Sequence, residues 1–144
     1  MALLSESDRE AVRAQLAGVA HPVTLLFFTQ SIDAPETALL ARQVVDEVAS
    51  LSDRVTVDEV NFVLDRDRAA ALGIEHIPSI AVLRGGEDTR IRFVGAPTGY
   101  EFVSLVEAVR LAGSDESGLS ESSRALIARH VTEPTDIQVF VTPT

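Results

Sequence analysis

The sequence contains no cysteine and no lysine in its 144 residues. Without a thiol the chain can form no disulfide, carry out no thiol–disulfide exchange and bind no metal through thiolates. No apolar run approaches the roughly 18 residues that a membrane-spanning helix needs, so no membrane partner is expected. Residues 1–8 lack the basic and apolar regions of a secretory signal, and a cytoplasmic location is therefore the default expectation.

Positive charge is scarce as well. The 12 basic residues, all arginine, are outnumbered by 22 acidic ones, which leaves a formal net charge of −10. This balance argues against a nucleic-acid partner, because such a partner needs a positive surface patch. The three histidines, His21, His76 and His130, are scattered without the spacing of metal ligands. The sequence therefore predicts no metal site, no cofactor and no bound nucleic acid.

The apolar pattern predicts one α/β domain, residues 1–112, in which helices and strands alternate. Ser7 with Glu10 matches a capping box and predicts a helix over 6–18. Val23–Phe28 predicts a buried strand, and Pro35 suits the first turn of the next helix. The remaining predicted elements are a strand from Val55 to Val60, a short helix over 65–72, a strand over 79–84 with its hairpin arm over 91–94, and a helix marked by Phe102, Leu105, Val106 and Val109.

The end of the sequence departs from this single-domain pattern. Residues 113–118 are predicted as a polar linker, and residues 119–144 as a helix followed by an apolar strand at Ile137–Val141. A strand at the end of a finished domain has nothing to lead into, so 119–144 is interpreted as the start of a second, truncated unit. An unpaired apolar strand also invites pairing with another chain, which predicts a homodimer through Ile137–Val141.

A proline at a strand entry is the most informative local feature. Ile77-Pro78-Ser79-Ile80 opens an apolar strand just after a short helix closed by Gly73, and Gly95 follows the hairpin. In this order, these features resemble the thioredoxin and glutaredoxin superfamily. The closer resemblance is to the glutaredoxin-like protein disulfide oxidoreductases and to the N-terminal domain of the alkyl hydroperoxide reductase flavoprotein subunit. It is carried by Val48–Arg54, Gly95–Phe102 and Ile137–Thr144.

The resemblance implies a fold and two candidate sites. The implied fold is a thioredoxin-like three-layer α/β/α sandwich with a mixed four-stranded sheet, followed by a C-terminal helix and an extra strand. A cis peptide bond before Pro78 is implied, with a peptide groove formed by His76, Ile77, Pro78 and Gly95. The family's Cys-x-x-Cys would fall at Pro35, Glu36, Thr37 and Ala38, where this chain has no thiol.

The function implied by the resemblance is a redox-inactive unit with no catalytic residue, which supports a catalytic Cys-x-x-Cys unit absent from this chain. The alternative is a stand-alone peptide-binding or chaperone-like module that uses the groove beside Pro78. A third hypothesis is a cysteine-independent enzyme in which Asp33 and Glu36 form a general acid/base pair. Carboxylates near a helix start are ordinarily capping and dipole partners, so this third hypothesis has the weakest basis.

Overall fold

A mixed four-stranded sheet forms the centre of the computed structural model, which describes residues 3–142. The strands are β1 (Val23–Thr29), β2 (Val55–Asn61), β3 (Ser79–Arg84) and β4 (Glu87–Val94), in the spatial order β2-β1-β3-β4. β1 runs parallel to β2, whereas β3 is antiparallel to both of its neighbours. Because β1 is central and covered on both faces, its residues form an almost continuous apolar run.

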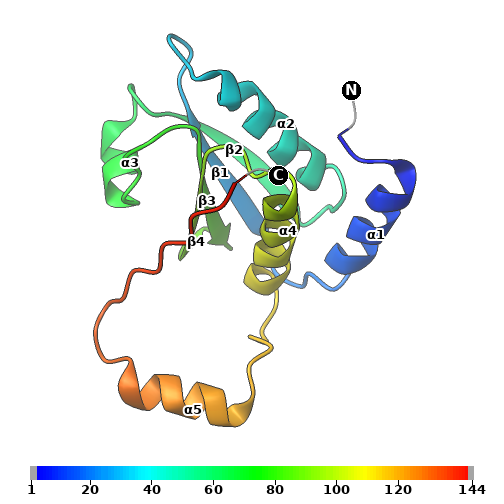
Figure 1. The fold of residues 1–144 in the computed structure, drawn as a ribbon, viewed down its shortest axis with the longest axis vertical. Helices are drawn as coiled ribbons and strands as arrows, with labels where there is room; N and C mark the ends of the chain where they lie inside the picture. Colours follow the sequence, from blue (N-terminus) through cyan, green and yellow to red (C-terminus); the bar gives the residue numbers. More distant parts are fainter. Residues whose placement is uncertain (1–2, 143–144) are drawn as a thin grey trace.

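Helices cover both faces of this sheet, which gives the three layers expected from the sequence (Figure 1). Leu25 and Phe27 of β1 point to the face covered by α1 (Glu6–Leu16), α2 (Glu36–Ala49) and α4 (Tyr100–Ala112). Leu26 and Phe28 point to the opposite face, where α3 (Arg66–Ala71) contributes Ala69. The predicted three-layer α/β/α arrangement with a mixed four-stranded sheet is confirmed.

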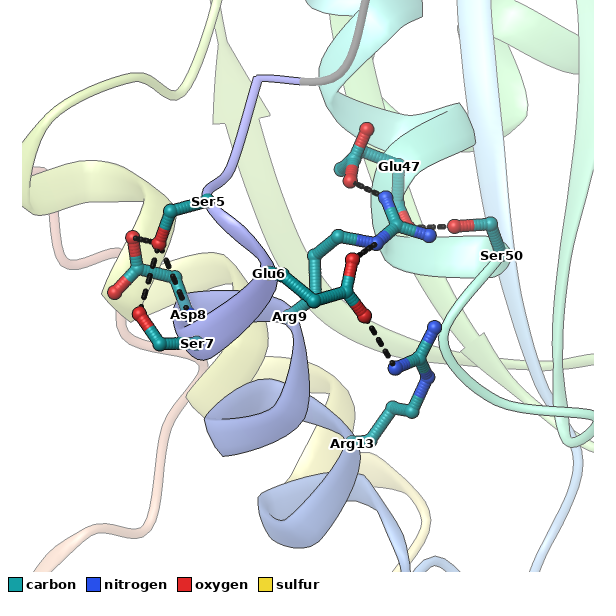
Figure 2. Close-up of polar contacts among 8 residues, drawn as sticks. All are labelled: Ser5, Glu6, Ser7, Asp8, Arg9, Arg13, Glu47 and Ser50. Carbon is teal, nitrogen blue, oxygen red and sulfur yellow. Dashed lines mark hydrogen bonds and ion pairs between the residues drawn. The ribbon is translucent and has the colours of Figure 1, made fainter.

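The first helix begins earlier than its capping pattern suggested. Ser5, in an extended conformation, is the N-cap, and its side-chain oxygen accepts a hydrogen bond from the Asp8 N–H at 3.2 Å. Ser7 already lies inside the helix, so the predicted cap at Ser7 with Glu10 is wrong. Both serines are followed three residues later by an acidic residue, and the structure uses the earlier pair (Figure 2).

A partly buried ion pair joins α1 to α2. Arg9 donates to the Glu47 carboxylate, with side chains only 20% and 10% exposed, whereas Arg13 pairs with the exposed Glu6 (Figure 2). We expect Arg9→Ala to lower the free energy of unfolding by about 1–3 kcal/mol, because it leaves the half-buried Glu47 charge without its donor. Urea unfolding measures this. The matched control Arg13→Ala should change stability by less than about 0.5 kcal/mol, and equal effects would contradict the assignment.

The residues after the domain form an arm, defined as residues 119–142, that contributes nothing to the core. It consists of α5 (Glu121–His130), which has no buried residue, and a tail, residues 131–142. The predicted C-terminal helix is present, but the predicted extra strand is not, since Ile137–Val141 pairs with no strand within residues 3–142. In Figure 1 a connecting segment leads from the end of α4 to α5, and after α5 the chain turns back toward the sheet. None of the helices described combines the length and apolar character that crossing a bilayer requires.

Candidate functional site

The first candidate site lies where β1 gives way to α2. A loop over residues 30–35 connects the two elements, and Pro35 is the N-cap of α2. Pro35 makes no side-chain hydrogen bond to the first turn, so the helix N-terminus keeps N–H groups available. Pro35, Glu36 and Thr37 are exposed, whereas Ala38 is buried at 7% exposure. The start of α2 therefore has one side chain that faces solvent, Pro35, and one three residues later that faces the core, Ala38.

The second candidate site, at the entry of β3, meets the first at one edge of the sheet. The Ile77–Pro78 peptide bond is cis. Ser79 pairs with Phe28, so Pro78 follows the antiparallel register to the level of Thr29, the last residue of β1. The helix start after β1 and the proline before β3 therefore share the same edge of the sheet. The structure thus brings together two segments that lie some forty residues apart in the printed sequence.

Three of the four residues of the predicted groove, His76, Ile77 and Pro78, are consecutive, and a backbone hydrogen bond connects them to the fourth, Gly95. Gly95 donates its N–H to the Pro78 carbonyl at 2.8 Å, and the Ser79 hydroxyl donates to the His76 carbonyl at 2.6 Å. Pro78 is buried, Ile77 and Gly95 are half-buried, and the His76 side chain is exposed. Within residues 3–142, the backbone N–H and carbonyl of Ile77 take part in no hydrogen bond. The backbone N–H and carbonyl of Ile77 are therefore free to form hydrogen bonds.

No thiol lies at this edge, because the sequence contains none. The carboxylates of Asp33 and Glu36 are exposed and make no hydrogen bond or ion pair with any described residue. Partial burial raises the pKa of the Glu101 carboxyl in the first turn of α4, but no activated side chain accompanies it. Over residues 3–142, no group of three or more potential ligands is arranged to hold a metal ion.

A polar cluster that the sequence did not reveal lies at the opposite end of β1 and β3. Asp115, from the predicted linker, accepts hydrogen bonds from His21 at 2.9 Å and from Arg84 at 2.5 Å. These bonds, with His21 the larger contributor, hold the pKa of the Asp115 carboxyl below its usual value. Arg84 also donates to the Ser114 carbonyl at 2.9 Å. The start of the predicted linker is therefore fastened to the domain, and sequence spacing offered no signal for a contact between such distant residues.

Known proteins share this architecture. A solved structure of the NTD_N/C domain of alkylhydroperoxide reductase AhpF from Enterococcus faecalis aligns with a TM-score of 0.80 and 33% identity, over 86% of this chain and 59% of that chain. A protein disulfide oxidoreductase from Aeropyrum pernix aligns with a TM-score of 0.73 and 26% identity, over 85% of this chain and 53% of that chain. The F subunit of the Escherichia coli K12 alkyl hydroperoxide reductase is 29% identical over 129 residues, which are 90% of this chain and 22% of that protein.

The chain is a thioredoxin-like unit. Its features are the sheet order, the helices on both faces of the sheet, and the cis proline at the same sheet edge as the start of α2. More particularly, the chain is related to the N-terminal domain of the alkyl hydroperoxide reductase AhpF, and the archaeal disulfide oxidoreductase is a further structural relative. No protein-family model matches the sequence. The chain spans only 10% to 22% of the length of the curated relatives that it matches, so their activities do not pass to it directly.

Proposed function

We propose that this chain is a redox-inactive thioredoxin-like unit that supports a catalytic Cys-x-x-Cys unit absent from the chain itself. The observation that carries the proposal is a complete thioredoxin-like scaffold with no cysteine in its sequence. The start of α2 and the cis proline before β3 lie at the same edge of the sheet, and the Cys-x-x-Cys position that the resemblance implies, Pro35 to Ala38, holds no thiol. Its relatives include an alkyl hydroperoxide reductase and a disulfide oxidoreductase, which supports a setting in thiol–disulfide chemistry.

The inactive part of this proposal has a direct test. The chain should reduce insulin with dithiothreitol no faster than buffer does, because dithiol exchange requires a thiolate nucleophile and the chain has none. The measurement is the rate at which the insulin solution becomes turbid. Turnover clearly above the buffer rate, and retained after treatment with a thiol-alkylating reagent, would refute the assignment because it would require chemistry other than cysteine exchange.

The supporting part needs a second measurement. A thioredoxin-like unit that carries Cys-x-x-Cys, fused after residue 144, should lose turnover or thermal stability when residues 1–118 are removed from the fusion. The reason is that a supporting unit contacts the folded catalytic unit, and this contact raises the stability of the catalytic unit. If the catalytic unit has the same rate and unfolding midpoint with and without residues 1–118, the chain does not support it.

A further inference from the structure

The segment between α4 and α5 is attached to the domain at its start. The carbonyl of Gly113 accepts two backbone N–H groups from the chain just before β1, at 2.9 and 3.1 Å. The Ser114 carbonyl accepts a hydrogen bond from the Arg84 guanidinium at 2.9 Å. The Asp115 carboxylate accepts hydrogen bonds from both His21 and Arg84. The first three residues after α4 are therefore bonded to the domain.

Asp115 is held by two separate elements at once, in a contact called here the Asp115 clasp (the Asp115 carboxylate with His21 and Arg84). His21 lies just before β1, and Arg84 is the last residue of β3. These two strands are neighbours and Arg84 pairs with Val23, so both donors lie at the same end of the sheet. A single hydrogen bond lets its acceptor rotate, whereas two donors on separate elements fix where the carboxylate lies. The chain therefore leaves the domain from a defined point.

Bonding distinguishes Asp115 from the acidic residue that follows it. A hydrogen bond between a carboxylate and a charged donor such as a guanidinium is about twice as strong as a neutral one. The adjacent carboxylate of Glu116 forms no hydrogen bond or ion pair with any residue from 3 to 142. Because the Asp115 side chain is 73% exposed, its pairs contribute little to the stability of the whole fold. Their main effect is local, on the path of the chain after residue 115.

Beyond the clasp, the linker is short and braced by its own serines. The Glu116 N–H donates to Oγ of Ser114 at 3.1 Å, and the Leu119 N–H donates to Oγ of Ser117 at 3.2 Å. From residue 116 to residue 141, no hydrogen bond or ion pair connects the chain to the domain, and α5 has no buried residue (Figure 1). The clasp is therefore the last bonded contact with the domain before residue 142, and the direction of α5 depends on it.

We propose that Asp115 is a positioning residue, whose clasp to His21 and Arg84 sets the direction in which the arm leaves the domain. A unit that supports another must hold it in a set orientation, and the clasp fixes the point from which that orientation starts. In this respect the inference deepens the proposed function and rests on it. The test uses this chain alone and measures no redox activity, so failure of the clasp and failure of the supporting role are distinguishable.

The absence of cysteine allows two spin labels to be attached only where thiols are introduced. Val103→Cys in α4 and Leu126→Cys in α5 are suitable, because these side chains are 62% and 56% exposed. Pulsed electron paramagnetic resonance then gives the distribution of distances between the labels, and we expect a narrow distribution. Adding Asp115→Ala should raise the fraction of molecules in a broad component by about 5-fold, the upper range for an exposed ion pair.

The matched control is Glu116→Ala, which removes the same charge from the adjacent residue and should leave the distribution narrow. Equal distributions with Asp115→Ala and Glu116→Ala would overturn the proposal, and so would a broad distribution in the labelled chain that keeps both acidic residues. Urea unfolding separates positioning from a general loss of stability. The two alanine variants should unfold at the same urea concentration, because both side chains are exposed. A lower midpoint for Asp115→Ala alone would show that Asp115 acts on the fold as a whole, and would overturn the positioning role.

Discussion

The variant Pro35→Cys with Ala38→Cys is expected to acquire dithiol–disulfide exchange activity that the wild-type chain lacks. The two positions are the N-cap and the third residue of α2, one exposed and one buried at 7%. The α2 N-terminus has no side-chain cap, so its N–H groups and dipole are available to stabilise a thiolate. Such an environment lowers a thiol pKa from about 8.5 to between about 3.5 and 7.5. The expected readouts are insulin reduction above the buffer rate and alkylation at unusually low pH.

The matched control places the same pair at another helix start. Ser120→Cys with Ser123→Cys puts thiols at the N-cap and third residue of α5, a helix with no buried residue that lies outside the domain. If the sheet edge positions the chemistry, this control should alkylate at a similarly low pH but reduce insulin much more slowly. Equal turnover in the two double variants would mean that a helix start alone suffices, and that the edge formed by α2 and Pro78 contributes nothing.

The substitution Gly113→Ala is expected to lower the free energy of unfolding by about 1–3 kcal/mol. Gly113 lies just after α4, and its carbonyl accepts the N–H groups of Ala20 at 2.9 Å and His21 at 3.1 Å. A Cβ at this position would lie 2.4 Å from Cγ1 of Val19, which is closer than real contacts allow. The backbone φ of −84° suits any residue, so the loss would come from overpacking and not from backbone strain. Urea unfolding curves of equal slope would measure it.

A second glycine, directly before Val19 in the chain, provides the control. Gly18 has no atom within 4 Å of an added Cβ, so Gly18→Ala should be neutral or stabilise the fold by up to about 1 kcal/mol. Combining Val19→Ala with Gly113→Ala removes the methyl group in conflict, so the double variant should lose less stability than the sum of the two single losses. A Gly113→Ala variant as stable as Gly18→Ala would show that the segment moves aside freely.

Most of the fold was predictable because its signals are local. The apolar run of β1, the Gly85-Gly86 turn between β3 and β4, and the apolar spacing of α4 each lie within about a dozen residues. Local chemistry does not distinguish Ser5 from Ser7 as the N-cap of α1, because an acidic residue follows each of them three positions later. The strand at Ile137–Val141 was predicted from its composition and from the resemblance. Within residues 3–142 it is not formed, because no other strand accepts its backbone hydrogen bonds.

The candidate site was predictable in part. The resemblance predicted a cis peptide bond before Pro78 and a helix start without cysteine at Pro35. The structure has the cis bond, and it brings both segments to one edge of the sheet. Whether His76, Ile77, Pro78 and Gly95 bind a peptide stays a prediction. The hydrogen bonds of Asp115 to His21 and Arg84 were not foreseen, because contacts between residues so far apart in the chain depend on how separate elements pack.

The sequence by itself determined that the chain cannot perform thiol chemistry, because it contains no cysteine and folding cannot supply a thiol. It also determined the order of helices and strands, because periodicity and turn residues act over short stretches of chain. Only the tertiary structure decided that Val19 packs against Gly113, that Asp115 binds His21 across 94 residues of sequence, and that the side chains of the tail are exposed. These features arise from the close approach of distant segments, which no local pattern records.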